Sequence, residues 1–254
     1  MKYNIFTVLN EGYERFGILF LSSIIDRLDL EKIDNIFVYD TGLSKETKKK
    51  FSLFQKVKII DSGMETDSDT KVHGKTWQKN VYSKAKLLKR CVIDQKQFYP
   101  TIMIDADSIF VNEFYNLIDL EKDLVLCKRS MRGRANNHIS NSSHIGSFFS
   151  FNKRNEKTLK FLDNWVAKIE NSINIDSNTG QYIAKESPAL SQTYEELKDE
   201  IIIGELPEPV ISNIETFPPK DAVIYHLKSD AGLMTVDERT SQPKARYYTL
   251  RYLA

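Results

Sequence analysis

Short apolar runs alternate with amphipathic segments over the first 105 residues. The apolar runs lack strict alternation, which is typical of strands that are covered on both faces of a sheet. They occupy residues 3–9, 35–40, 56–60 and 101–105. Strands that alternate with helices indicate βαβ units and a parallel sheet.

Helices are predicted between these strands. Apolar residues recur at helical spacing in a first helix, at Phe16, Leu19, Phe20, Ile24 and Leu28. Ser44 can cap a second, polar helix. Residues 61–76 are polar and contain glycine, so they predict a mobile loop. Residues 77–93 predict a third helix with one apolar face, formed by Val81, Ala85, Leu88 and Val92.

The second half of the chain continues the pattern less regularly. Helices are expected at residues 113–120, 155–170 and 188–197, and strands at residues 124–129, 146–151 and 222–226. Asn155 can start its helix, Pro188 falls near the first turn of the next, and four prolines mark a loop-rich stretch between residues 207 and 219. Because no repeat or linker interrupts the pattern, residues 1–254 are expected to form a single α/β domain.

The fourth predicted strand ends in two acids. In "TIMIDADSIF", Asp105 and Asp107 follow an apolar run, at the end of a strand where open α/β sheets bind ligands. Two carboxylates on one turn repel each other unless a cation compensates, and hard divalent ions prefer oxygen ligands. The pair therefore indicates a metal site. A strand end with Asp105 capping a turn and Asp107 solvated accounts for the same residues.

Composition restricts the class of protein. Hydrophobic residues make up 41% and charged residues 28%, as in a soluble globular protein. Thirty-six Lys and Arg against 35 Asp and Glu give a net charge of +1, so no general attraction to nucleic acid is expected and anions must be bound locally. Cys91 and Cys127 lack motif spacing and are expected to be reduced packing residues. Without a signal peptide or a run of ~18 apolar residues, a cytoplasmic protein with no transmembrane segment is predicted, and peripheral membrane contact through partners is compatible with this.

Six motifs around the acid pair occur in the order found in one enzyme family. They are "FTVLNEGYERFGILFLSSI", "VYDTGLS", "YSKAKLL", "SHIGSFFSF", "ESPALSQ" and "VIYHL". With the Asp-x-Asp at 105–107, the chain resembles the GT-A fold glycosyltransferases, which are nucleotide-diphospho-sugar transferases. It is most similar to the retaining family 8, or glycogenin-type, branch that includes bacterial lipooligosaccharide galactosyltransferases.

The resemblance implies a fold and an activity. The fold would be a GT-A (Rossmann-like) single domain with a mixed, mostly parallel central sheet flanked by helices. Residues 1–110 would be its nucleotide-binding half, ending in the Asp-x-Asp motif, and residues 111–254 its acceptor-side half. The activity would be that of a metal-dependent hexosyltransferase, which moves a sugar from a UDP-sugar to a glycan or other hydroxyl acceptor with retention.

The resemblance also implies roles for particular residues. Asp105, Asp107 and His226 would hold Mn²⁺ or Mg²⁺. The donor would be bound by Thr7, Asn10, Tyr13, Asp40, Lys84, Ala106, Gly146 and Lys228 along with the two acids. His144, Glu186 and Ser187 would act at the reacting sugar, with Ser187 in place of the usual Gln. The family's Lys-bearing tail is not matched by "HLKSDAGLM", so Lys228 is only a candidate.

The role of a basic stretch stays open, and three other classes of protein fit the sequence to different degrees. Lys128, Arg129, Arg132 and Arg134 predict either a solvated loop or a lid that recognises a phosphate or an acidic acceptor. A haloacid-dehalogenase-type phosphatase would need Thr or Val at Ile109 and a later Gly-Asp-x-x-x-Asp cluster, which is absent. A nucleotidylyltransferase would need a Gly-rich, Arg-containing loop after the first strand, which "LNEGYERFG" does not supply. The departures at Ser187 and after His226 also suit a catalytically inactive GT-A-like protein that binds a nucleotide sugar or glycan.

Overall fold

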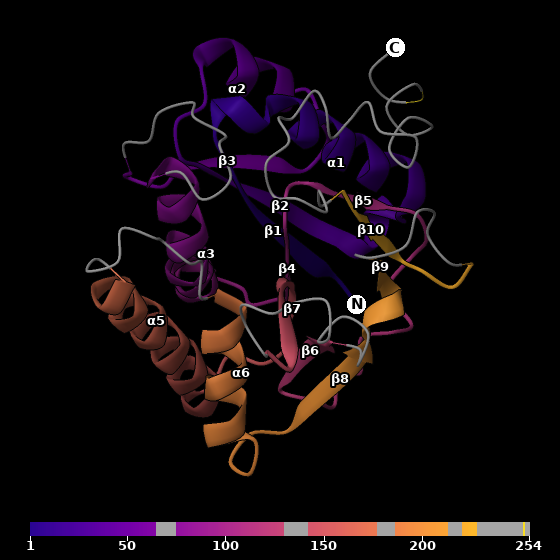
Figure 1. Ribbon diagram of the computed structural model, residues 1–254. Helices are drawn as coiled ribbons and strands as arrows, with labels where there is room; N and C mark the ends of the chain where they lie inside the picture. Colours follow the sequence, from indigo (N-terminus) through magenta and orange to yellow (C-terminus); the bar gives the residue numbers. More distant parts are fainter. Residues whose placement is uncertain (65–74, 130–141, 177–185, 213–219, 228–250, 252–254) are drawn as a thin grey trace.

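The computed structural model describes residues 1–64, 75–129, 142–176, 186–212, 220–227 and 251 (Figure 1). In this part of the chain, seven strands form a central sheet in the order β3-β2-β1-β4-β7-β6-β8. They are β1 (Tyr3–Leu9), β2 (Ile33–Asp40), β3 (Val57–Asp61), β4 (Thr101–Ile104), β6 (Leu124–Lys128), β7 (His144–Phe151) and β8 (Ile203–Pro207). β7 runs antiparallel to β4 and β6, and the other pairs are parallel. The predicted mixed, mostly parallel α/β sheet is therefore confirmed.

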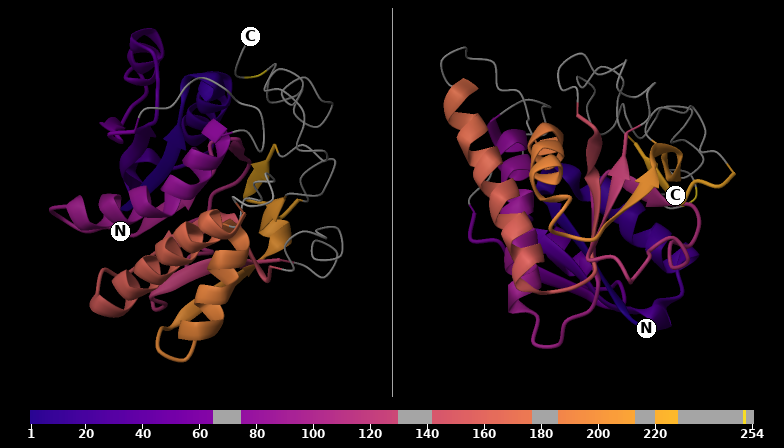
Figure 2. Two further views of the ribbon diagram at one scale, coloured as in Figure 1. Left: turned by 60° about the vertical axis from the view of Figure 1, so that its left-hand side comes forward. Right: turned by 90° about the horizontal axis from the view of Figure 1, so that it is seen from below.

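Helices cover both faces of this sheet (Figure 2). On one face lie α1 (Glu14–Arg27) and α2 (Lys45–Phe51), and on the other α3 (Lys75–Asp94), α5 (Glu156–Asp176) and α6 (Glu186–Leu197). The predicted caps are confirmed, since the side chains of Ser44 and Asn155 accept the backbone N–H groups of Thr47 and Thr158. Cys91 and Cys127 are buried and free, as expected. Among the described residues, no helix is long and apolar enough to span a bilayer.

A small second sheet lies against α1. It has the order β5-β10-β9 and consists of β5 (Ser108–Phe110), β10 (Ile224–His226) and β9 (Ile211–Ser212). β5 and β10 are antiparallel, with Ser108 opposite His226. Ile109 and Tyr225 of this sheet pack with Phe16 of α1 in a small hydrophobic cluster. This packing brings the end of β10 to the turn that follows β4.

Some sequence-based predictions were wrong. Residues 113–120 are not a helix: a single turn bond from Leu117 N–H to Phe114 O is followed by irregular chain. So short a segment is marginal as a helix, and here Tyr115 instead donates its hydroxyl to Asp29 O, 86 residues away. The strands β5, β8 and β9 were not predicted. Residues 65–74 of the predicted loop at 61–76 lie outside the described part, whereas Asp61 belongs to β3 and Lys75 starts α3.

Gly17 allows α1 to approach α2 closely. A Cβ atom at this position would lie 2.5 Å from Cζ of the buried Phe51 and 3.0 Å from Cδ1 of Leu9. Overpacking costs about 1–3 kcal/mol and the higher helix propensity of alanine returns up to about 1 kcal/mol, so Gly17→Ala should lower the free energy of unfolding by about 1 kcal/mol. Urea denaturation measures this. A double variant with Phe51→Leu should lose less than the two single changes together, and simple additivity would contradict the steric explanation.

Candidate functional site

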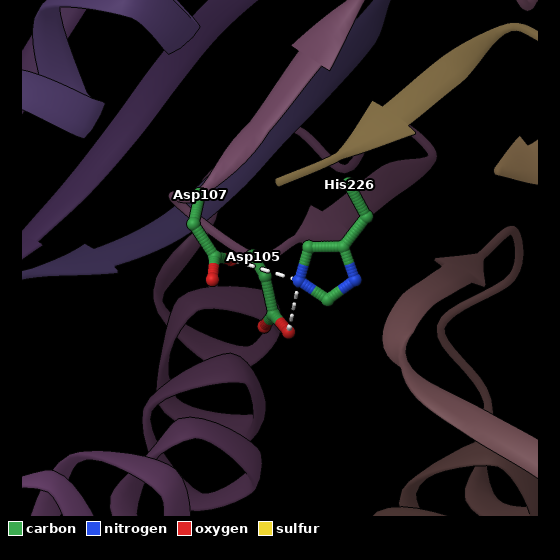
Figure 3. Close-up of side chains that lie close together, drawn as sticks. All are labelled: Asp105, Asp107 and His226. Carbon is green, nitrogen blue, oxygen red and sulfur yellow. Dashed lines mark hydrogen bonds and ion pairs between the residues drawn. The ribbon is translucent and has the colours of Figure 1, made fainter. Parts of the chain in front are cut away.

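The two acids from the middle of the chain and a histidine 119 positions after Asp107 meet beyond the end of β4. Nε2 of His226 lies 2.9 Å from Oδ1 of Asp107 and 3.8 Å from Oδ2 of Asp105 (Figure 3). One potential ligand atom from each residue lies within 4.8 Å of the others. The acids sit in the turn between β4 and β5, and the β5–β10 pairing fixes His226 beside them. The three residues that the family resemblance implies as metal ligands therefore lie together, and their binding of a metal stays a prediction.

The three side chains fit a divalent cation. Two carboxylates and an imidazole form a donor set that suits Mn²⁺ and can also serve Mg²⁺. The imidazole is buried, and the carboxylates keep 24% (Asp105) and 15% (Asp107) of their side-chain surface exposed, so a ligand can reach them from solvent. Within the residues that the structure describes, this is the one group of three or more acidic, His or Cys side chains that could hold a metal ion.

A buried lysine joins the acid pair to α6. Nζ of Lys84 pairs with Asp105 and lies 2.8 Å from Oε1 of Glu186. Burial by itself lowers the pKa of Lys84, but the negative charges of Asp105 and Glu186 raise it well above its ordinary value, so the side chain stays an ammonium. With the acids ionised, three carboxylates and one ammonium leave two negative charges. A divalent cation would neutralise this excess.

The start of α6 lies directly over an irregular part of β7. The β6–β7 register shifts between Leu126, opposite Phe149, and Cys127, opposite Ile145. In this irregular part, Gly146 donates its backbone N–H to Oγ of Ser187 at 3.0 Å. A Cβ atom on Gly146 would lie 2.7 Å from Cδ of Glu186. Glycine at position 146 is therefore required for the close approach of Glu186. The next residue, Ser187, is hydrogen-bonded to β7 at this same glycine.

His144 is packed within the protein. The residue is 1% exposed, its Nε2 lies 3.0 Å from Oε1 of Glu205, and its Nδ1 lies 2.9 Å from Oγ of Ser143. Its ring centroid is 4.3 Å from that of Tyr194. Both ring nitrogens thus have protein partners, as in a structural core histidine. The predicted role of His144 in catalysis stays a prediction.

The other predicted donor residues that the structure describes lie in or just after β1, β2 and β4. Thr7, in β1, is fully buried, and its hydroxyl has no hydrogen-bond partner among the described residues. Asn10 is buried after β1, Tyr13 packs on Phe16, and Ala106 is buried between the two acids. Lys228 lies outside the described residues, so its role stays a prediction.

Two glutamates that the sequence analysis does not single out connect separate elements around the site. Glu11 accepts the N–H of Ser44 at 2.7 Å and the hydroxyl of Thr47 at 2.9 Å, which ties the loop after β1 to the start of α2. Glu205 pairs with His144 and, at 2.7 Å, with Lys128. No local pattern marks these residues, because their partners are 33 to 77 positions away. Of the predicted basic stretch, Arg132 and Arg134 lie outside the described residues.

Asp40, a predicted donor-binding residue, holds the turn after β2. Its Oδ1 accepts the N–H groups of Gly42 at 2.8 Å and Leu43 at 2.6 Å, and its Oδ2 pairs with Lys48. Burial by itself raises the pKa of Asp40, but these hydrogen bonds and Lys48 bring it below its ordinary value. These contacts are those of a turn cap, and donor binding by Asp40 stays a prediction.

Asp40→Ala should lower the free energy of unfolding at pH 7 by about 1.5–3 kcal/mol, the range for hydrogen bonds to a charged group. Because the pKa is lower in the folded than in the unfolded protein, this contribution is complete at neutral pH. It is lost as the pH falls from about 4, the ordinary aspartate value, through the folded-state pKa. Urea denaturation of both proteins at several pH values from 7 to 3 measures the difference. A difference that does not change with pH would contradict the ionic origin of the effect.

Comparison with known proteins agrees with the fold. No protein-family model and no curated protein matches the chain. A structure of the galactosyltransferase LgtC in complex with donor and acceptor sugar analogs is similar, with a TM-score of 0.51 and 12% identity over 81% of this chain and 74% of LgtC. The apo structure of the bifunctional glycosyltransferase WbbM gives a TM-score of 0.54 and 11% identity over 100% of this chain and 52% of WbbM. Matches at this identity establish the fold and not the activity, and the chain has the GT-A fold of these structures.

Proposed function

We propose that this protein is a metal-dependent glycosyltransferase that takes a sugar from a nucleoside-diphosphate donor and transfers it to a hydroxyl acceptor. The observation that carries the proposal is the meeting of Asp105, Asp107 and His226 at the carboxyl edge of a GT-A sheet. An acid pair alone could be an ordinary strand end. A histidine supplied by a second sheet, within 3.8 Å of both acids, is not explained by capping a turn.

The proposal assigns a different role to each group of residues in the site. Asp105, Asp107 and His226 would hold Mn²⁺ or Mg²⁺, which would offset the charge that develops on the leaving diphosphate. Lys84 keeps Asp105 and Glu186 together in one buried charged group. Glu186 and the backbone of Gly146 would face the donor sugar, and Thr7, Asn10 and Tyr13 would face the nucleoside.

The finer assignments belong to the same proposal. UDP is the proposed nucleotide, a hexose the proposed sugar, and retention the proposed stereochemistry, all through the resemblance to the family 8 or glycogenin-type branch. A glycan or another alcohol is the proposed acceptor, and the cytoplasm the proposed location.

Calorimetric titration tests the proposal. The protein is titrated with UDP and with GDP in Mn²⁺ and again after EDTA, and release of UDP from UDP-hexoses is then followed with and without simple sugar acceptors. We expect UDP to bind only with the metal and a UDP-hexose to be turned over. Failure of both nucleotides to bind, or binding that EDTA does not change, would refute the proposal. Metal-dependent binding with no turnover of any donor would support the inactive GT-A-like binding protein instead.

A further inference from the structure

The first turn of α6 is held on β7 by two serine hydroxyls. Oγ of Ser191 accepts the backbone N–H of His144 at 3.1 Å and donates to the carbonyl of Ser187 at 2.8 Å. Ser187 in turn accepts the N–H of Gly146 at 3.0 Å. The indole N–H of Trp165 donates to the carbonyl of Glu186 at 3.2 Å. β7, α5 and the first turn of α6 thus come together at Glu186, the residue that pairs with Lys84.

The position of each residue in β7 explains why these hydroxyls are needed. Gly146 lies where the register with β6 shifts, whereas His144 is opposite Lys128, beyond the part of β7 that pairs with β4. Their N–H groups need other partners, and leaving a buried N–H unpaired is costly. The hydroxyls of Ser187 and Ser191 supply partners to Gly146 and His144. A serine inside a helix is otherwise unfavourable, because its side chain competes for backbone hydrogen bonds. Ser191 is buried, so this competition is not relieved by solvent.

We propose that Ser191 is a positioning residue that fixes the first turn of α6 and so sets Glu186 against Lys84 and Asp105. The inference rests on the proposed function. Ser191 touches none of the three candidate metal ligands in its hydrogen bonds, which run to His144 and Ser187. Its effect would therefore pass through Glu186, which is proposed to face the sugar, and would reach the metal ligands only indirectly, through Lys84 and Asp105.

Ser191→Ala tests the inference, with Thr193→Ala as the matched control. Thr193 is also buried in α6 and donates its hydroxyl to the carbonyl of Ala189 at 2.8 Å, a bond that stays within the helix. Amide hydrogen exchange of the full chain is followed at His144 and Gly146. UDP affinity in Mn²⁺ and the kcat and KM of UDP-hexose turnover are measured on the same proteins.

In Ser191→Ala, exchange at His144 should rise at least tenfold, kcat should fall about tenfold, and the UDP dissociation constant should change less than twofold. Thr193→Ala should leave all of these near the wild-type values, and Ser191→Thr, which keeps the hydroxyl, should restore most of kcat. Unchanged exchange at His144 in Ser191→Ala would overturn the inference. It would also be overturned if Ser191→Ala and Thr193→Ala lost kcat and UDP affinity to the same extent. If the unaltered protein binds no nucleotide, the proposed function fails by itself, and the exchange at His144 and in the first turn of α6 then decides whether Ser191 holds Glu186.

Discussion

Asp107→Ala is expected to lower the Mn²⁺-dependent affinity for UDP at least 100-fold. The variant removes one of three candidate ligands and leaves Asp105 and His226 with an incomplete donor set. It relieves the repulsion between the two acids but also removes the 2.9 Å contact with Nε2 of the buried His226, so the metal-free variant should stay close to the wild type in stability. Calorimetric titration with UDP in Mn²⁺ gives the affinity, and thermal unfolding without metal gives the stability.

Asp34→Asn provides the control for this variant. Asp34 lies near the start of β2, at the end of the sheet opposite to the one where Asp107 lies, and pairs with the exposed Lys2 at 3.2 Å. Its replacement should leave UDP affinity within twofold of the wild-type value. If Asp107→Ala binds UDP as the wild type does, or binds it equally well in Mn²⁺ and EDTA, the acid pair is not the metal site.

Lys84→Met is expected to lower the free energy of unfolding of the metal-free protein by about 3 kcal/mol, because removal of one partner leaves buried charge without compensation. Asp105 and Glu186 would then face each other with no ammonium between them. Mn²⁺ should recover more stability in this variant than in the wild type, because the cation offsets the charge of Asp105. Urea denaturation with and without Mn²⁺ measures both effects.

Two further variants separate this effect from the loss of a lysine in general. Lys89 lies on the same helix and pairs with Asp163 on the surface, so Lys89→Met should change stability by less than about 1 kcal/mol. The double variant Lys84→Met/Glu186→Gln should be more stable than Lys84→Met, since it removes one of the uncompensated charges. Additive losses in the double variant would mean that Lys84 and Glu186 are not coupled.

The local pattern of the sequence was sufficient for the fold up to the end of β4. β1, β2, β3 and β4 lie within two residues of their predicted bounds, and the caps at Ser44 and Asn155 form as expected. These features depend on residues close together in the chain, where period and capping chemistry are visible. β8 was missed because it is a short edge strand that contains Gly204 and ends in Pro207, residues that ordinarily mark a turn.

The candidate site could also be predicted only in part from the local sequence. The residues around Asp105 and Asp107 by themselves indicated an acid pair at the end of a buried strand, whereas His226 came from the family resemblance. The contacts of Lys84 with Glu186, Ser191 with His144, and His144 with Glu205 lie outside any local pattern. The two residues of each pair are 47 to 102 positions apart and lie on different elements.

The sequence by itself determined most of the strands and helices and that two carboxylates follow β4. Only the tertiary structure decided what surrounds those carboxylates. His226 reaches Asp107 across 119 positions because β5 and β10 pair and pack on α1. Glu186 reaches Lys84 because a shifted register in β7 and the missing side chain of Gly146 let α6 approach. Such contacts depend on the packing of whole elements, which no short stretch of sequence specifies.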